Sequence, residues 1–245
     1  MSYTPVIDST ILSRRDITAT NGRTLHLLEL AYPDFRFEPG QFVMVQLQDQ
    51  GFQWSYPYMI YKKTENGLQV LSSSYSSLYR CTEGDPIAVW GANGKGCQPA
   101  PASVFITEAA TFHLIAPLIE ACKDPRLIFI GTEEMAPKVL IPSDTVCISD
   151  LSDISTLLPD IHAEIFMALN LSNIEKVMEN MNAELKNQIK IFVSTRIGCG
   201  IGACKSCYLH SPDINIGIPV CCNGPYLPYC EIDFEKDRKC FQTFQ

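Results

Sequence analysis

A glycine-rich cysteine motif near the C-terminus constrains this 245-residue chain more than any other feature. Cys199, Cys204 and Cys207 have the spacing C-x4-C-x2-C, and Cys221 follows later. This is the ligand spacing of a plant-type [2Fe–2S] cluster. Glycines inside the loop leave backbone amides free to surround inorganic sulfide. A structural zinc site usually has two C-x2-C pairs, whereas this motif has one. The motif therefore predicts a [2Fe–2S] cluster held by these four cysteines.

Other cysteines lie close to the motif. Cys222 is adjacent to Cys221 and could replace it as the fourth ligand. Cys230 and Cys240 fall outside the spacing, and we expect them to be ordinary thiols. The chain has 11 cysteines, and its first residues lack the basic flank and apolar core of a secretion signal. We therefore expect a reducing, cytoplasmic location and a metal site instead of a disulfide framework.

The composition of the chain argues against a membrane-spanning helix and against a nucleic-acid partner. Hydrophobic residues make up 46% of the chain and charged residues 19%, which is ordinary for a globular protein. No apolar stretch approaches the roughly 20 residues that a membrane-spanning helix needs. The formal net charge is −8, so we expect no nucleic-acid partner.

Two regions with different hydrophobic patterns precede the cysteine motif. The first contains short apolar or aromatic segments separated by turns, which is typical of an antiparallel barrel. These segments are Thr24–Leu30, Phe42–Leu47, Tyr56–Tyr61, Leu68–Ser72 and Pro86–Trp90. After a proline-rich linker come continuous apolar runs with helical stretches between them, as in a parallel α/β domain. These runs are Val104–Thr107, Leu127–Gly131, Thr145–Ser149, Glu164–Ala168 and Ile189–Ser194.

The pattern predicts three parts: a β-barrel over residues 1–98, an α/β domain over 103–195, and a cluster-binding tail over 196–245. The clearest expected helix is Ser172–Asn187, where Ser172 and Glu175 would form a capping box at the N-terminus.

The cysteine motif resembles that of a known family. The motif with Val220-Cys221-x-x-Gly224-Pro225 is similar to the cluster loop of the electron-transfer subunit of dihydroorotate dehydrogenase B, within the ferredoxin-reductase group. Pro39–Val43 and Trp90–Gly96 resemble two barrel segments of that family. The resemblance covers nearly the whole chain and favours Cys221 over Cys222. It implies a ferredoxin-reductase-like two-domain architecture, β-barrel plus α/β, with a C-terminal [2Fe–2S] tail.

The flavin motifs of the family are altered here. Its Arg-Pro-x-Ser corresponds to Tyr56–Met59, and its Gly-x-Gly-Thr turn to Ser72–Ser77. The arginine that neutralises a pyrophosphate is therefore missing, while several hydroxyls remain. Charge could come instead from Lys62, Lys63, Arg80 or a partner chain, and tyrosines could stack on rings. The resemblance implies FAD against Tyr56, Pro57, Tyr58, Met59, Ser72, Ser73, Ser74 and Tyr75.

The nicotinamide motifs are altered further. The family's Gly-Gly-Gly-x-Gly turn corresponds to Thr107–Thr111, in which Glu108 places a carboxylate where phosphate would bind. We expect that carboxylate to satisfy the N-terminus of the helix that follows. The family's Cys-Gly-Pro corresponds to Ala168-Leu169-Asn170. We therefore expect no tight binding of NAD(P) at this position.

Three functions fit these patterns. The first is an electron-transfer subunit that carries a [2Fe–2S] cluster and FAD and relays electrons to or from a catalytic flavoprotein subunit, such as a dihydroorotate dehydrogenase-like one. The second is a flavin-free adaptor that carries only the cluster, and the third is a complete NAD(P)H-dependent reductase. We predict the first and expect no catalytic residue in this chain. The histidines, which we expect to be structural or exposed, are His26, His113, His162 and His210.

Overall fold

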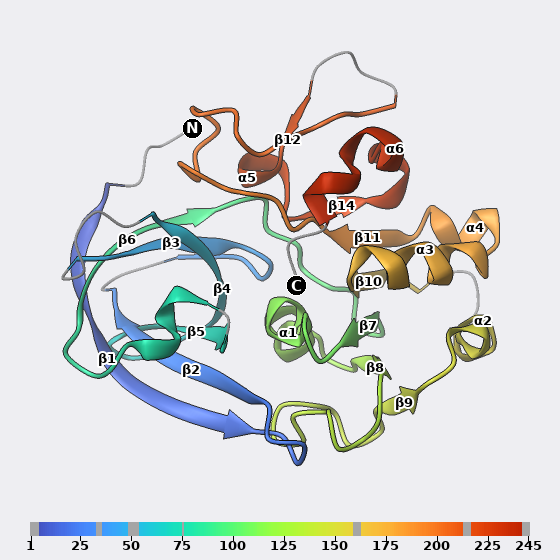
Figure 1. Ribbon diagram of the computed structural model, residues 1–245, viewed down its shortest axis with the longest axis horizontal. Helices are drawn as coiled ribbons and strands as arrows, with labels where there is room; N and C mark the ends of the chain where they lie inside the picture. Colours follow the sequence, from blue (N-terminus) through green and yellow to red (C-terminus); the bar gives the residue numbers. More distant parts are fainter. Residues whose placement is uncertain are drawn as a thin grey trace.

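A closed barrel and an open six-stranded sheet form the two main bodies of the chain (Figure 1). The computed structural model describes residues 5–32, 36–48, 54–74, 76–158, 163–212 and 217–241. The barrel has the strand order β1-β2-β5-β4-β3-β6, and all its neighbouring strands pair antiparallel. Its strands are β1 (Ile7–Thr18), β2 (Thr24–Ala31), β3 (Phe42–Leu47), β4 (Tyr56–Lys63), β5 (Gly67–Ser73) and β6 (Pro86–Asn93).

Alternating apolar side chains fill the barrel. Leu28, Leu30, Val43, Ile60 and Val70 are all fully buried within one cluster. These branched residues favour strands because they pack well on a pleated surface. The predicted barrel is confirmed, but its first strand was missed, because β1 carries charged and polar residues at most positions of its exposed face.

The second body is a mostly parallel sheet in the order β14-β11-β10-β7-β8-β9. Its strands are β7 (Val104–Glu108), β8 (Arg126–Ile130), β9 (Val146–Ile148), β10 (Ile165–Ala168), β11 (Ile189–Phe192) and β14 (Tyr226–Pro228). Continuous apolar runs form the central strands, and Phe105 stacks on Phe166 with ring centroids 5.5 Å apart. The antiparallel edge strand β14 comes from the predicted tail, so that segment completes the sheet.

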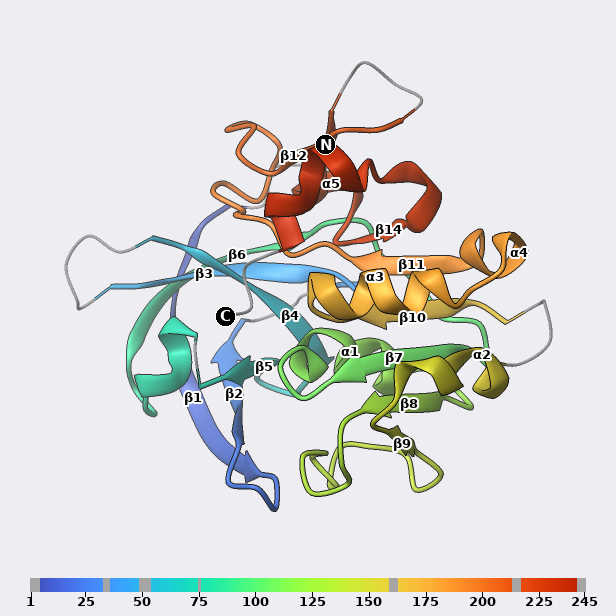
Figure 2. The same ribbon diagram turned by 45° about the vertical axis from the view of Figure 1, so that its right-hand side comes forward.

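Helix α1 (Phe112–Ala121) lies between the barrel and the sheet, while α3 (Leu171–Glu179) and α4 (Ala183–Lys186) cover the other face (Figures 1 and 2). Tyr61 on β4 donates a hydrogen bond to Glu120 Oε2 on α1 at 3.1 Å, which joins the two bodies. The remaining short elements are η1 (Ser77–Arg80), η2 (Leu151–Asp153), α2 (Ile154–Leu157), β12 (Tyr208–Leu209), β13 (Ile218–Pro219), α5 (Val220–Asn223), η3 (Tyr229–Glu231), α6 (Phe234–Asp237) and η4 (Arg238–Phe241).

The single helix predicted over Ser172–Asn187 is wrong. Two helices form instead, and each begins at an asparagine whose side chain accepts a backbone N–H: Asn170 from Asn173, and Asn182 from Leu185. The capping box of Ser172 and Glu175 is therefore replaced by an asparagine cap two residues earlier.

Within the described residues, no helix is both long enough and apolar enough to cross a membrane.

Candidate functional site

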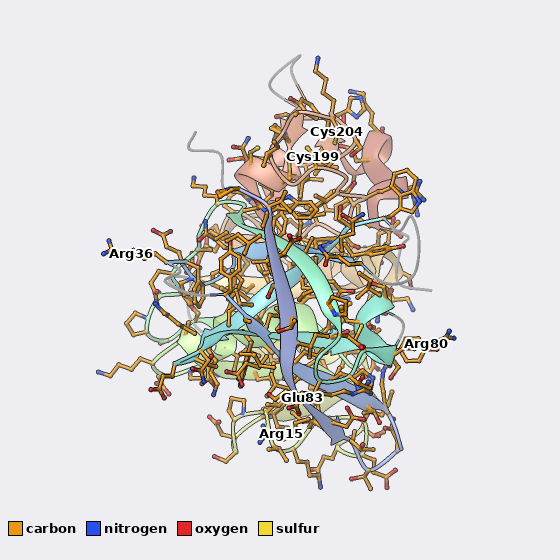
Figure 3. The ribbon with its side chains drawn as sticks, turned by 90° about the vertical axis from the view of Figure 1, so that its left-hand side faces the viewer. Arg15, Arg36, Arg80, Glu83, Cys199 and Cys204 are labelled. Atoms are coloured by element: carbon orange, nitrogen blue, oxygen red, sulfur yellow. The ribbon has the colours of Figure 1, made fainter. Side chains whose placement is uncertain are left out.

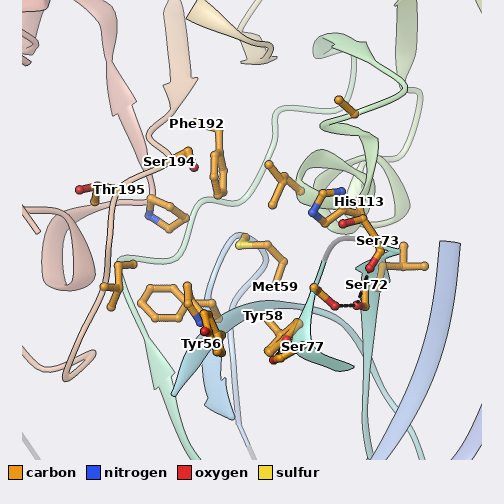
Figure 4. Close-up of a pocket in the computed structure, with 18 of the residues that line it drawn as sticks. Tyr56, Tyr58, Met59, Ser72, Ser73, Ser77, His113, Phe192, Ser194 and Thr195 are labelled. Atoms are coloured by element: carbon orange, nitrogen blue, oxygen red, sulfur yellow. Dashed lines mark hydrogen bonds between the residues drawn. The ribbon is translucent and has the colours of Figure 1, made fainter. Parts of the chain in front are cut away.

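A cavity of about 550 Å³ lies where the barrel, α1 and the end of β11 meet (Figure 4). Barrel strands, the η1 turn, the start of α1 and the segment after β11 all contribute to its wall. Its lining comprises Arg23, Phe42, Tyr56, Pro57, Tyr58, Met59, Leu71, Ser72, Ser73, Ser76, Ser77, Tyr79, Ala110, His113, Leu114, Phe192, Val193, Ser194, Thr195, Ile197 and Pro225. A cavity with mostly apolar walls and a few polar groups is a typical ligand site.

Most residues predicted to contact flavin lie in this lining. Tyr56, Pro57, Tyr58, Met59, Ser72 and Ser73 all contribute to the wall. Ser74 does not: it is exposed, and its hydroxyl donates to Thr24 O at 3.0 Å. Tyr75 lies outside the described residues. The segments at Tyr56–Met59 and Ser72–Ser77, distant in sequence, are therefore brought together.

Hydroxyl groups fix the serine-rich wall. Tyr58 is buried, and its hydroxyl lies 2.8 Å from Ser77 Oγ and accepts the Leu78 N–H at 3.3 Å. Burial raises the pKa of Tyr58. Ser72 and Ser76 share a hydrogen bond across the turn (Figure 4). These bonds hold the η1 turn against β4, so the wall is built before any ligand enters.

Among the lining residues that were not predicted as site residues, two carry nitrogen-bearing side chains. Arg23 comes from the β1–β2 hairpin and His113 from the first turn of α1. Burial of the imidazole and, after it, the charge of Arg23 lower the pKa of His113 to about 4, so the ring is neutral at pH 7. No sequence motif marks either residue, because both reach the cavity only through the packing of the two bodies. His113 is thus a cavity residue, and His162 lies outside the described residues.

The cations proposed from sequence are placed elsewhere. The Arg80 guanidinium lies over the Tyr79 ring at 4.9 Å and points away from the body of the protein (Figure 3). The Lys62 ammonium lies 5.6 Å from the centroid of the Tyr61 ring. Neither these residues nor Lys63 belong to the cavity wall.

The cysteine loop begins where the cavity wall ends. Ile197 lines the cavity, and the Gly198 carbonyl accepts a hydrogen bond from Ser55 Oγ at 3.2 Å. The Trp90 indole donates to Cys199 O at 3.0 Å. Gly200 has φ of 77°, and a Cβ there would lie 2.8 Å from Met44 Cγ, so only glycine fits this approach of loop to barrel.

Backbone amides point at the cysteine sulfurs. Gly202 N–H donates to Cys221 Sγ at 3.1 Å, while the N–H groups of Ile201 and Cys204 donate to Cys199 Sγ at 3.5 and 3.4 Å. Such bonds stabilise thiolate over thiol, which is the form that binds iron.

The four predicted ligands form two pairs. A hydrogen bond with Cys221 lowers the pKa of Cys207 to about 6, and the same contact raises that of Cys221. Cys204 contacts Ser206 at 3.0 Å and also Cys199, and these bonds lower its pKa to about 7. In the described ranges, no group of three or more His, Cys, Asp or Glu side chains is arranged so that it could hold a metal ion. The thiols are thus brought together as pairs.

The neighbouring cysteines differ from these pairs. Cys222 Sγ lies 3.8 Å from Cys221 Sγ, but the Gly202 amide and Cys207 both contact Cys221. Cys230 is exposed.

The α/β sheet has a second position where ligands commonly bind. Strand order reverses between β7 and β10, and the carboxyl ends of such strands flank the nucleotide crevice of doubly wound folds. Glu108 ends β7, and Asn170 lies just beyond β10. Glu108 Oε1 accepts the backbone N–H of Asn170 at 2.8 Å, and Asn173 Nδ2 donates to Glu108 Oε2 at 2.7 Å.

This carboxylate is enclosed by amides. The Asn170 side chain donates to both Glu108 oxygens at 2.9 Å, and Glu108 is only 8% exposed. Thr111, at the start of α1, hydrogen-bonds the carbonyl of Ala168. The expectation that Glu108 serves the N-terminus of the next helix, α1, is wrong; it serves the N-terminus of α3 instead. The reason is that sheet order places the ends of β7 and β10 side by side.

Comparison with known proteins gives structural matches only. No protein-family model and no curated protein sequence matches the chain. Among solved structures, a chain of an NADH-dependent reduced ferredoxin-NADP oxidoreductase, described for flavin-based electron bifurcation, has a TM-score of 0.70 at 14% identity, covering 95% of this chain and 92% of that one.

Two further structures match less of the chain. A ferredoxin NADP+ reductase from Neisseria gonorrhoeae with bound FAD and NADP has a TM-score of 0.53 at 12% identity, covering 76% of this chain and 97% of that one. The ferredoxin reductase of a carbazole 1,9a-dioxygenase gives 0.56 at 14% identity, with 77% and 69% covered. These likenesses show that this chain has a ferredoxin-reductase-like fold, as the sequence predicted.

Proposed function

We propose that this chain is an electron-transfer protein that binds a flavin, as FAD, in the cavity and a [2Fe–2S] cluster at Cys199, Cys204, Cys207 and Cys221. It would relay electrons to or from a partner flavoenzyme, such as a dihydroorotate dehydrogenase-like catalytic subunit. A flavin can exchange electrons in pairs or singly, whereas a [2Fe–2S] cluster exchanges them singly, so a flavin can connect a two-electron partner to the cluster.

The observation that carries this proposal is the continuity of the cavity with the cysteine loop. Ile197 lines the cavity and lies two residues before Cys199. On the barrel side, Tyr56 lines the cavity while the preceding Ser55 holds the Gly198 carbonyl. One segment from each body therefore joins the two sites, as electron transfer between neighbouring cofactors requires.

The cavity residues fit a phosphorylated flavin. Met59, Phe192 and Ile197 offer apolar and aromatic surface for a planar ring, and the serine-rich wall offers hydroxyls. The Nδ1 atom of His113 is buried and has no hydrogen-bond partner in the described part of the chain. A buried polar atom left unpaired is costly, so such an atom in a cavity wall favours a polar ligand nearby.

The cysteine pairs fit a two-iron cluster. In such a cluster each iron takes two protein ligands, which matches pairs better than a single group of four. Amides that already donate to Cys199 and Cys221 would tune the potential of a bound cluster.

The nucleotide crevice of the sheet does not fit NAD(P) in the usual way. The Glu108 carboxylate lies in this crevice and accepts the Asn170 N–H and the side-chain amides of Asn170 and Asn173, so a negative charge is already held where an anionic dinucleotide would approach. We therefore propose that nicotinamide is not the electron donor at this position.

Absorbance spectroscopy with iron, sulfide and flavin analysis of the full chain, purified without oxygen, tests the proposal. We expect iron and acid-labile sulfide in equal amounts together with FAD. Cluster without flavin would support the adaptor function instead. Flavin without iron would overturn the cysteine assignment.

A further inference from the structure

The cavity has two chemically different ends. One end lies at Phe192 and Thr195 (Figure 4), and the chain continues from there through Ile197 into the cysteine loop. The other end carries the serine-rich wall and His113 (Figure 4), and Arg23 also lines the cavity. Figure 4 shows the His113 ring beside Ser73, on the opposite side of the cavity from Thr195. The hydroxyl end is therefore the one equipped for an anionic group.

Arg23 reaches this end because the β1–β2 hairpin bridges the two bodies. The hairpin is closed by Ala19 N–H donating to Arg23 O at 2.8 Å, and Gly22 adopts φ of 85° at its tip. The Asn21 N–H donates to Glu134 O at 3.1 Å, which ties the tip to the loop after β8. Arg23 is thus held on a hairpin that is closed within the barrel and tied to the loop after β8.

His113 faces Arg23 from the other body. Both residues line the same cavity, and the guanidinium charge adds to burial in lowering the pKa of His113. Its Nδ1 atom is buried and unpartnered within the described residues, so the ring has unused hydrogen-bonding capacity. A neutral imidazole and a permanent cation beside several hydroxyls make a site for an anion with many acceptor oxygens.

The serine wall is rigid enough to position such an anion. Arg14 donates to the carbonyls of Tyr79 at 2.6 Å and Cys81 at 2.9 Å, which holds η1 from outside the cavity. Tyr58 holds the same turn from inside through Ser77.

We propose that Arg23 and His113 bind the phosphate group of the flavin and replace the arginine that the barrel motif lacks. This inference rests on the proposed function, since it assumes that the cavity holds a flavin. The phosphate would lie between the hairpin, α1 and the serine wall, with the ring directed toward the cysteine loop. The ligand class is a phosphorylated flavin, not riboflavin.

The test compares three flavins on the flavin-stripped full chain. Dissociation constants for FAD, FMN and riboflavin are measured by fluorescence quenching for the wild type, Arg23→Gln and Arg15→Gln. Arg15 is exposed on the adjacent strand β1 and does not line the cavity, so its loss controls for net charge.

We expect Arg23→Gln to weaken FAD and FMN about 10- to 100-fold, since a charge-assisted contact is lost, and to leave riboflavin within about twofold. Arg15→Gln should change none of the three by more than about twofold. Arg23→Lys should recover part of the loss, which a structural defect would not permit. His113→Gln should weaken FAD and FMN by a smaller factor.

Three results would overturn the assignment. If Arg23→Gln binds FAD as the wild type does, Arg23 does not hold the phosphate. If it weakens riboflavin as much as FAD, the residue acts on the ring or on folding. If the wild type binds none of the three flavins, the proposed flavin function is itself wrong, and the assignment is wrong with it.

Discussion

Two positions in this molecule differ in whether the chain's own groups fill them. At the boundary of the barrel, a cavity of about 550 Å³ is lined by hydroxyls, aromatic rings and two nitrogen-bearing side chains. At the carboxyl ends of β7 and β10, the corresponding space is filled by Glu108, which the amides of Asn170 and Asn173 surround. One fold can therefore keep one ligand position open while the chain's own side chain closes the other.

The two positions differ in whether their buried polar groups already have hydrogen-bond partners within the described part of the chain. The Glu108 carboxylate accepts four hydrogen bonds from buried or half-buried donors, so an incoming phosphate would have to displace it. In the cavity, His113 Nδ1 stays without a partner among the described residues. Polar groups that are already paired exclude a ligand, whereas an unpaired one favours a ligand.

The largest expected effect is the loss of iron and sulfide when a cysteine of the loop next to the cavity is replaced. Cys207→Ser should abolish iron and sulfide binding, because Cys207 is buried and paired with Cys221. Cys230→Ser is the matched control, since that thiol is exposed, and it should leave the metal content unchanged. Iron and sulfide analysis and EPR of the reduced protein make the comparison. Full metal content in the Cys207→Ser variant would show that Cys207 is not a cluster ligand and would contradict the cluster assignment to this loop.

At the closed position, Glu108→Ala should reduce the free energy of unfolding by about 3 to 5 kcal/mol. The substitution leaves the amides of Asn170 and Asn173 without their anion at a buried site. Glu83→Ala removes an exposed carboxylate and should cost less than about 0.5 kcal/mol. Urea unfolding of both variants measures the difference. Equal stability of the two would mean that the closure at Glu108 contributes little.

A smaller expected effect is a dependence of folding stability on pH, caused by His113 in the cavity wall. The pKa of His113 is about 4 in the folded chain, against an ordinary value of 6.5. The unfolded chain therefore takes up a proton first, and stability is full above pH 6.5 and falls as the pH decreases toward 4. The loss should reach about 2 to 3 kcal/mol.

His113→Gln isolates that contribution. Its stability should vary less than that of the wild type between pH 6.5 and 4 in the flavin-free chain. Asp16, whose pKa is lowered to about 2 by Arg14, adds its own loss only below pH 4. Parallel curves for wild type and variant would show that the imidazole is not enclosed as described.

The two positions also differ in how far the sequence predicts them. The barrel, the parallel strands and the cysteine spacing follow from local pattern, and so does the grouping of Tyr56–Met59 in one strand. The closure at Glu108 does not, because it depends on β7 pairing with β10, which no local pattern specifies. An asparagine cap at Asn170 could have been noticed, yet Ser172 with Glu175 gave a competing capping signal.

Arg23 and His113 show the same limit. Each lies in an ordinary segment, a hairpin and the start of a helix, and only the packing of the two bodies brings them to one cavity. The sequence shows that the barrel motif lacks its arginine. The cations near that motif along the chain are Lys62, Lys63 and Arg80, and none of them lines the cavity. The replacement that we propose comes from a hairpin and a helix, and only tertiary structure brings these to the cavity, so spacing along the chain does not reveal it.

The central claim, that one ligand position is kept and the other closed, is tested most directly by stopped-flow reduction of the FAD-loaded full chain. The protein is mixed without oxygen either with dithionite or with micromolar NADH, and flavin and cluster absorbance are followed. We expect dithionite to bleach both chromophores and NADH to leave them unchanged over the first second. Bleaching by NADH within that second would show that nicotinamide reaches the flavin despite Glu108, and would contradict the account.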